Sequence, residues 1–258
     1  MKITRKEFLK LSGAGLVVLS GRKVLAALDA AAQSQTDAPS SNQRPKQWGM
    51  IVDTRKCAKD QGCTRCIEAC TTTHNIPSIQ DSGHQIKWIW EEPFEDIVSS
   101  YQTQYMAESR KEEPTPVLCN HCDDPPCTRV CPTGATWKRK EDGIVMMDWH
   151  RCIGCRYCMA ACPYGSRSFN WVDPRPYIKS LNLDFPTRTK GVVEKCTFCA
   201  ERLAKGQPPA CVEACPEKAL LFGDLNDPQS EIRKALASGY TLRRKPELGT
   251  GPNIYYVV

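Results

Sequence analysis

Sixteen cysteines constrain this 258-residue chain more than any other feature, because they fall into four groups of four. In every group, three residues separate the third cysteine from the fourth. In the third group, two residues separate each of the earlier pairs, and a proline follows the last cysteine. The groups are Cys57, Cys63, Cys66 and Cys70; Cys119, Cys122, Cys127 and Cys131; Cys152, Cys155, Cys158 and Cys162; and Cys196, Cys199, Cys211 and Cys215.

Spacing of this kind suits iron–sulfur cubanes, each of which is held by four cysteine thiolates. Ferredoxins with two cubanes use a C-x2-C-x2-C-x3-C-P run whose fourth cysteine ligates the neighbouring cluster. Residues 152–163 match that run at every position. The proline keeps the preceding turn from continuing regularly, so the fourth thiol is carried towards a second cluster. The sequence therefore predicts four 4Fe–4S clusters, groups that interlock in pairs, and the transfer of single electrons.

The other three groups contain longer gaps. Five residues separate Cys57 from Cys63, four separate Cys122 from Cys127, and eleven separate Cys199 from Cys211. In addition, Thr71 stands where the other groups have proline. Insertions between ligands are tolerable because the cost of closing a loop grows slowly with its length. We therefore expect all four groups to bind clusters, with the first group the least regular.

A structural zinc or disulfide protein is the alternative of another class. Zinc sites use isolated groups of four ligands and need no trailing Cys-Pro. Cysteines this close together in the sequence are poorly placed for several unstrained disulfides at once. Iron and acid-labile sulfide analysis separates these alternatives from a four-cluster protein.

The N-terminus has the order of an export signal, in which basic residues precede an apolar stretch and then small residues. Residues 4–10 resemble a twin-arginine motif with Lys6 at the second arginine position, and the apolar stretch 11–19 is too short to span a bilayer comfortably. Clusters are assembled in the cytoplasm, so a protein that carries them must be exported folded. We expect residues 1–32 to be a twin-arginine-type signal peptide that directs the protein to the periplasm, at the extracytoplasmic face of the membrane.

Net charge gives no indication of nucleic-acid binding. The whole chain carries +6, but residues 1–32 hold six Lys/Arg and two Asp/Glu, so the remainder has 29 basic and 27 acidic residues. Clusters with their thiolates add further negative charge. The sequence also contains no recognisable nucleotide-binding loop, nucleophile with its base or catalytic carboxylate pair, which predicts a non-catalytic protein.

The remaining patterns predict an α+β fold with two ferredoxin-like lobes. Residues 33–47 read as a flexible linker, and 48–258 as the four-cluster domain. We expect one lobe from 48–75 with 190–258, and the other from about 117–172. Strands are predicted at 49–53 and 253–257, a hairpin at 136–148, a hairpin-like insertion within 71–118, and a helix from Pro228 to Ala237 capped by Asp227. His121 lies inside the second group but is not needed as a ligand.

The motifs at residues 119–132, 152–165, 196–199 and 211–216 resemble the four-cluster ferredoxin subunits of membrane-bound dimethyl sulfoxide, polysulfide, formate and nitrate reductase complexes. The resemblance covers residues 48–258. It implies that the first group pairs with the fourth and the second with the third. The implied sets are Cys57, Cys63, Cys66 with Cys215; Cys196, Cys199, Cys211 with Cys70; Cys119, Cys122, Cys127 with Cys162; and Cys152, Cys155, Cys158 with Cys131.

Residues 48–57, 144–152, 168–171 and 223–228, together with the leader, are more specifically similar to the DsrO and HmeA-type subunits of DsrMKJOP and Hdr-like menaquinol oxidoreductase complexes. This resemblance implies an electron relay between an NrfD-like integral membrane subunit that binds quinone and a multihaem cytochrome c. It also implies a place in sulfur metabolism such as sulfate reduction. The alternative within this class is a partner of a molybdopterin catalytic subunit.

Overall fold

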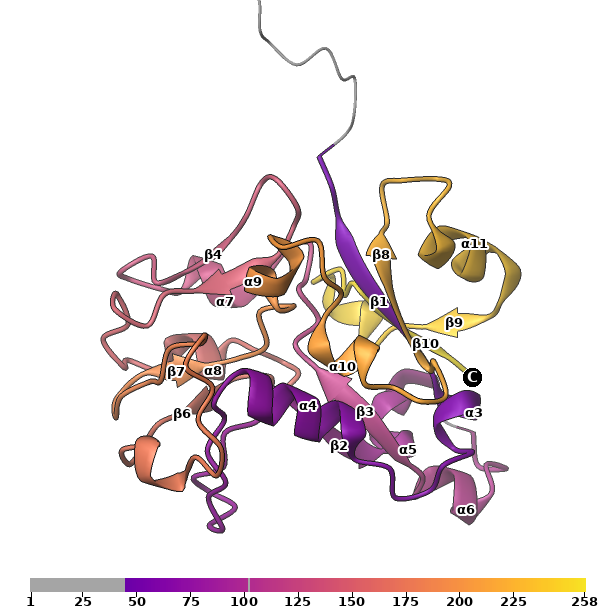
Figure 1. The fold of residues 1–258 in the computed structure, drawn as a ribbon. Coiled ribbons are helices and arrows are strands. Elements are labelled where there is room, and N and C mark those ends of the chain that lie inside the picture. Colours follow the sequence, from indigo (N-terminus) through magenta and orange to yellow (C-terminus); the bar gives the residue numbers. More distant parts are fainter. Residues whose placement is uncertain (1–44, 102) are drawn as a thin grey trace, which may run out of the picture. The chain divides into compact units, whose positions relative to one another are not determined.

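The computed structural model describes residues 45–101 and 103–258, in which small sheets are joined by short helices and long loops (Figure 1). The largest sheet has the strand order β8-β1-β10-β9. β1 (Trp48–Asp53) pairs in parallel with β10 (Ile254–Val257) and antiparallel with β8 (Leu220–Asp224), while β9 (Thr241–Leu242) pairs with β10. The mixture of helices and strands agrees with the predicted α+β class, and the strands predicted at both ends of the domain are confirmed.

β1 is an internal strand, paired on both edges, and both of its faces are covered. Successive side chains of a strand point to opposite faces. Met50 and Val52 pack into the main hydrophobic core, whereas Ile51 packs against Ile232 of α11 (Glu231–Ser238). A strand buried on both sides reads as a continuous apolar run, which the sequence shows here.

The helix predicted from Pro228 begins later than expected. α11 starts at Glu231, and its N-cap is Ser230, whose side chain accepts a hydrogen bond from the backbone of Arg233. Asp227 instead accepts a hydrogen bond from the backbone of Gln229, which closes a turn before the helix. Aspartate favours such local turns as well as helix caps, so its presence alone does not decide where the helix begins.

Three two-stranded sheets complete the strand pairing among the described residues. β4 (Thr136–Lys138) and β5 (Val145–Met147) confirm the predicted hairpin. β2 (Ile89–Pro93) pairs antiparallel with β3 (Pro114–Leu118), which confirms the hairpin-like insertion predicted within residues 71–118. β6 (Ser168–Phe169) pairs with β7 (Val193–Glu194).

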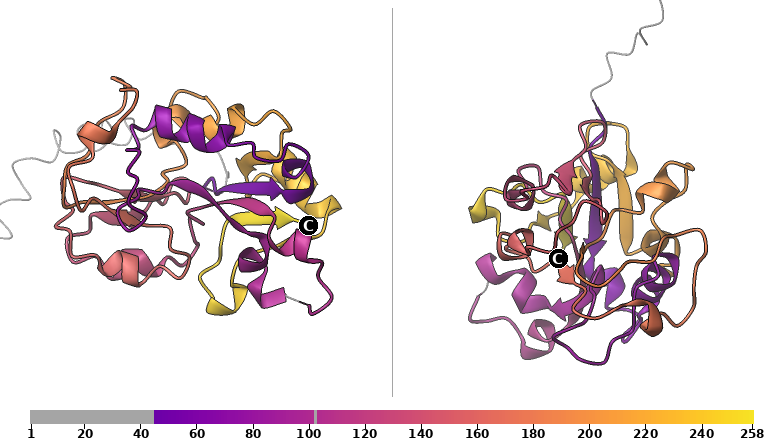
Figure 2. Two further views of the ribbon diagram at one scale, coloured as in Figure 1. Left: turned by 90° about the horizontal axis from the view of Figure 1, so that it is seen from below. Right: turned by 90° about the vertical axis from the view of Figure 1, so that its left-hand side faces the viewer.

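Most of the helices are single turns. Nucleating a helix is costly and short helices are marginal by themselves, so packing must hold these turns in place. The longest helix that carries cysteines is α4 (Arg65–Thr73), which lies beside α10 (Ala210–Glu213). Both helices are seen on the same side of the large sheet in Figures 1 and 2. The helices other than α11 are α3 (Thr54–Cys57), α4 (Arg65–Thr73), α5 (Phe94–Ile97), α6 (Glu108–Lys111), α7 (Pro126–Arg129), α8 (Tyr157–Ala160), α9 (Ala200–Leu203) and α10 (Ala210–Glu213).

The predicted signal peptide at 1–32 and nearly all of the predicted linker at 33–47 lie outside the described residues. Within the residues that are described, no helix is long and apolar enough to cross a bilayer.

Candidate metal centres

The fold gathers the sixteen cysteines into four sites of four, and each site mixes two sequence groups. We assign them from the thiols that act as one another's charged neighbours and from the cavities that they line. Site 1 contains Cys57, Cys63, Cys66 and Cys215; site 2 contains Cys70, Cys196, Cys199 and Cys211; site 3 contains Cys119, Cys122, Cys127 and Cys162; and site 4 contains Cys131, Cys152, Cys155 and Cys158.

Strand pairing explains how the first and fourth groups meet at site 1. β1 runs antiparallel to β8, and at the end of this pair Asp53 donates its backbone N–H to Ala219 O at 2.8 Å. Cys57 follows the end of β1, and Cys215 precedes the start of β8. The two cysteines therefore reach the same edge of the sheet, although more than half of the sequence separates them.

Sites 3 and 4 line two neighbouring cavities that meet at one small hydrophobic cluster. The four thiols of site 3 line one cavity together with Tyr164 and Arg167, and the four thiols of site 4 line another with Ile153 and Arg156. Cys127 and Cys158 come from the contacting turns α7 and α8, and both belong to the hydrophobic cluster that includes Val145. A cavity surrounded by four thiols suits a cofactor with four thiolate ligands.

A repeated backbone conformation forms the cysteine loops. The residue immediately before the second cysteine of every group has a positive φ: it is Gly62, His121, Gly154 and Phe198 in turn. A left-handed residue reverses the chain direction in a single step, which allows two cysteines on either side of it to face one centre. Glycine stands at only two of the four positions, so this repeat is not visible in the sequence.

Backbone N–H groups point at several of the sulfurs. Ala219 N lies 3.2 Å from Cys215 Sγ, and Phe198 N lies 3.4 Å from Cys196 Sγ. Hydrogen bonds from the backbone also lower the pKa of the Cys131 thiol, although burial works in the opposite direction. Such N–H···S contacts are among the factors that set the potential of an iron–sulfur cluster.

The sites form a row in the order 1, 2, 3, 4. Cys211 of site 2 has Cys66 of site 1 among its charged neighbours, and Cys196 of site 2 has Cys119 of site 3. Cys158 of site 4 has Cys127 of site 3. All four thiols of site 2 are buried, as are three of the four in site 3, whereas sites 1 and 4 each have three partly exposed thiols. The row thus has a buried middle and two ends that approach the surface.

The protonation chemistry of the thiols fits a cluster. Burial raises the pKa of Cys57 to about 11, and those of Cys66 and Cys122 to about 12, and neighbouring thiols add to each rise. Four such thiols cannot all ionise at neutral pH unless positive charge lies among them, because burial and mutual repulsion both oppose thiolates. The irons of a cubane supply that charge, and among the described residues all sixteen cysteines are free of disulfides.

The histidine inside the second group lies between the sites and has a structural environment. His121 is fully buried and stacks on Phe198, with 3.8 Å between the ring centroids. Its Nδ1 accepts a hydrogen bond from the backbone N–H of Val145 at 3.1 Å. Burial lowers its pKa well below the usual range, and nearby cations add to this effect. His121 and Phe198 occupy equivalent loop positions, so this stack joins the second group to the fourth.

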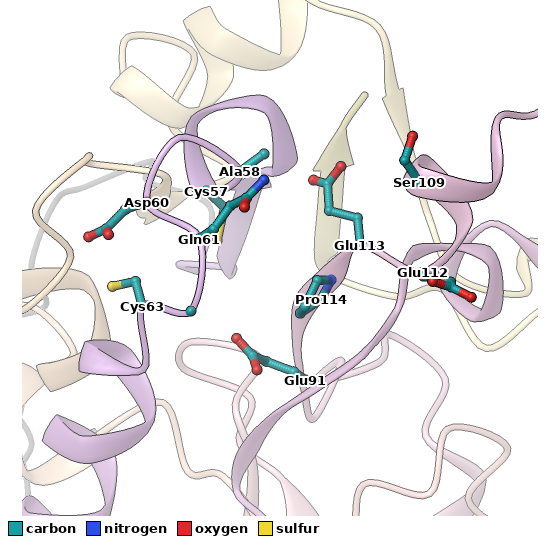
Figure 3. Close-up of a pocket in the computed structure, with 11 residues that line it drawn as sticks. Cys57, Ala58, Asp60, Gln61, Cys63, Glu91, Ser109, Glu112, Glu113 and Pro114 are labelled. Atoms are coloured by element: carbon teal, nitrogen blue, oxygen red, sulfur yellow. The ribbon is translucent and has the colours of Figure 1, made fainter.

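The surface end at site 1 is acidic. A cavity of about 290 Å³ opens beside Cys57 and Cys63 and is lined by Asp60, Glu91 and Glu113 among others. Figure 3 shows Glu91 and Glu113 across this opening from the loop that carries the two cysteines. Glu113 forms an ion pair with Arg110, whereas burial raises the pKa of Glu91.

The surface end at site 4 is apolar and basic. Ile153 and Tyr157 flank its loop and are 65% and 63% exposed. The guanidinium of Arg156 lies over the rings of Phe169 and Trp171, at 5.3 and 4.7 Å from the centroids. The two ends of the row therefore present different surfaces.

Comparison with known proteins agrees with this architecture. Residues 111–225 match a 4Fe–4S dicluster domain. The sequence is 37% identical to Hdr-like menaquinol oxidoreductase iron-sulfur subunit 1 of Archaeoglobus fulgidus, over 98% of the present protein and 97% of that one. It is 38% identical to the menaquinone reductase iron-sulfur cluster-binding subunit of Nitratidesulfovibrio vulgaris, over 82% and 88%. It is also 38% identical to the B subunit of the polysulfide reductase of Wolinella succinogenes, over 82% and 94%. The dicluster match and the sixteen cysteines fit four 4Fe–4S clusters.

Proposed function

Because the chain belongs to the family of iron–sulfur electron-transfer subunits of menaquinol-, polysulfide- and dimethyl sulfoxide-type oxidoreductases, we propose that it conducts electrons along the row of sites 1 to 4. The observation that carries this proposal is the burial pattern, with a buried middle and two partly exposed ends. Such an arrangement admits an electron at one end and releases it at the other, while the middle is kept from side reactions with solvent.

The ligand assignment within this proposal follows the four sites. Each site holds one cubane through three cysteines of one group and the fourth cysteine of its partner group. Groups one and four thereby form one interlocked lobe, and groups two and three form the other. The bound clusters supply one-electron redox chemistry, and the protein supplies the ligands, the spacing and the surrounding charge.

We further propose that the partners are an NrfD-like integral membrane subunit that binds quinone and a multihaem cytochrome c, in a complex of sulfur metabolism. Support comes from the relatives, two of which are named for menaquinol or menaquinone and one for polysulfide. A molybdopterin catalytic subunit is the second candidate partner, which the relatives named as dimethyl sulfoxide and selenate reductase subunits favour. The leader-like residues 1–32 support a location on the extracytoplasmic face.

Iron analysis tests the clusters. The purified protein should contain about sixteen iron atoms and as many acid-labile sulfides per chain, and fewer than about eight iron atoms would contradict four clusters. Cys158→Ser should remove or alter only the site 4 cluster, whereas the control Ile153→Ser, in the same loop, should retain all four. Proteins that co-purify from detergent-solubilised membranes then distinguish a cytochrome c partner from a molybdopterin subunit.

A further inference from the structure

A buried arginine lies between sites 3 and 4. Arg167 is 5% exposed, and its Nη2 donates to Cys127 Sγ at 3.0 Å and to Thr136 Oγ1 at 2.9 Å. The Cys158 thiol is also among the charged neighbours of this guanidinium. Because Cys127 belongs to site 3 and Cys158 to site 4, one guanidinium donates to a sulfur of site 3 and places its charge close to a sulfur of site 4.

In the described part of the chain, no carboxylate lies within ion-pair distance of this guanidinium. Its third polar contact is Met147 Sδ, at 3.8 Å from Nη1. Its negatively charged neighbours are the sulfur groups of Cys127, Cys158 and Cys119, and the buried Lys195 adds a second positive charge nearby. Burying a cation is costly unless negative charge compensates for it. Here the compensating charge can come only from thiolates and what they bind, so Arg167 is arranged towards the two sites.

A charge at this place acts on electron transfer rather than on proton transfer. An arginine side chain stays protonated in proteins, so its charge is permanent. Uptake of an electron makes a cluster more negative, and a nearby positive charge in a poorly screened interior stabilises that state. When site 3 is reduced by a neighbouring site, that neighbour is oxidised, and no bond forms or breaks and no proton moves.

Site 1 has the opposite surroundings. The charged groups other than cysteines that act on the Cys57 thiol are Glu91 and Glu113, and both are negative. Site 3 also has the buried Lys195 nearby, whose Nζ donates to Cys196 O at 2.7 Å and whose charged neighbours include Cys119. Positive charge thus lies beside sites 2, 3 and 4, with Arg167 between the last two, and negative charge lies beside site 1.

We propose that Arg167 is a potential-tuning residue whose fixed charge raises the reduction potentials of sites 3 and 4 together, so that electrons in the row collect at this end. The inference rests on the proposed function, since it takes the four sites to hold clusters. It goes further by assigning a role to a residue that is not a ligand, and by predicting that electrons in the row accumulate at sites 3 and 4.

Potentiometric titration of the purified holoprotein, followed by electron paramagnetic resonance, tests this role. In Arg167→Met, the components of sites 3 and 4 should show a reduced-to-oxidised ratio about tenfold lower at a given potential, a shift of about 59 mV for a one-electron couple. Cys122→Ser and Cys158→Ser identify the two components. Arg167→Lys, which keeps the charge, should restore most of the wild-type ratio.

The matched control is Arg233→Met, which removes the same charge from the exposed face of α11 and should leave every component unchanged. A change below about twofold in Arg167→Met with full iron content would overturn the proposal. If Arg167→Met loses iron, Arg167→Gln, which can still donate a hydrogen bond to Thr136, takes its place. Loss of iron from both neutral variants, with retention in Arg167→Lys, would make Arg167 a structural residue and would also overturn the proposal.

Failure of the proposed function gives a different result. If the wild-type protein contains fewer than about eight iron atoms, the four-cluster row itself is wrong. If the wild type has its full iron content and Arg167→Met has the same potentials as the wild type, the four-cluster row is supported and the tuning role of Arg167 is wrong.

Discussion

Sites 1 and 4 are the two surface ends of one row, and they differ in almost everything except their four thiols. Site 1 opens into a cavity lined by carboxylates, whereas the loop of site 4 is flanked by exposed apolar side chains and the site lies near a buried arginine. The same ligand chemistry is therefore placed in a negative field at one end and in a positive field at the other. This contrast indicates that the surroundings, rather than the ligands, distinguish the ends of the row.

The largest expected difference between the ends is in metal loss. Treatment of the holoprotein with a membrane-impermeant iron chelator should remove iron from site 1 first, because Cys57 and Cys63 are partly exposed beside an open cavity. Site 2 should lose iron last because all four of its thiols are buried. Iron content followed together with the resonance components measures the order. Simultaneous loss from all sites would show that chelation follows global unfolding instead.

A matched pair of glycine substitutions separates the loops of the two ends. Gly154 in site 4 has φ +70°, and a Cβ there would lie 2.4 Å from Gly191 O, whereas Gly62 in site 1 has φ +77° and open space around it. Gly62→Ala should cost about 1 kcal/mol from backbone strain alone. Gly154→Ala adds a clash with backbone, so it should cost more and reduce iron occupancy at site 4. Thermal unfolding and iron analysis measure both effects, and equal losses in the two variants would contradict this difference.

Removing negative charge at site 1 should produce a smaller shift than removing Arg167, and in the opposite direction. Glu91→Gln should raise the reduction potential of the site 1 component, since the carboxylate lines the same cavity as Cys57 and its charge acts on that thiol. Solvent screens this largely exposed group, so we expect about a twofold change in the reduced-to-oxidised ratio. The control Glu231→Gln changes an exposed side chain of α11 and should have no effect. A lower potential in Glu91→Gln would refute the charge contrast.

The smallest effect is expected in α11, a helix that carries none of the sixteen cysteines. Ser230→Ala removes the N-cap of α11 and should reduce the free energy of unfolding by about 1 kcal/mol. Ser238→Ala, at the other end of the same helix, removes only an exposed hydrogen bond to Ala235 O and serves as the control. Chemical denaturation measures both variants. Any change of cluster potential in Ser230→Ala would mean that α11 is coupled to the sites.

Local features of the fold were predictable from the sequence wherever a short pattern decides the structure. The hairpin at β4 and β5 follows from the Glu-Asp-Gly turn at residues 141–143, and β1 follows from a continuous apolar run. The predicted start of α11 was wrong because Asp227 and Ser230 are both suitable cap residues. Choosing between them depends on the packing of Ile232 against β1, which is a long-range contact.

Cofactor chemistry follows from the sequence alone, because ligand type and short spacing are properties of neighbouring residues. Four groups of cysteines with a constant closing gap imply cubanes before any fold is known. The surroundings of each site, by contrast, exist only in the folded protein. Arg167 and Glu91 are ordinary charged residues in the sequence, and folding places one against Cys127 and the other beside site 1. Electrostatic energy depends on distance and burial, and neither can be read from positions along the chain.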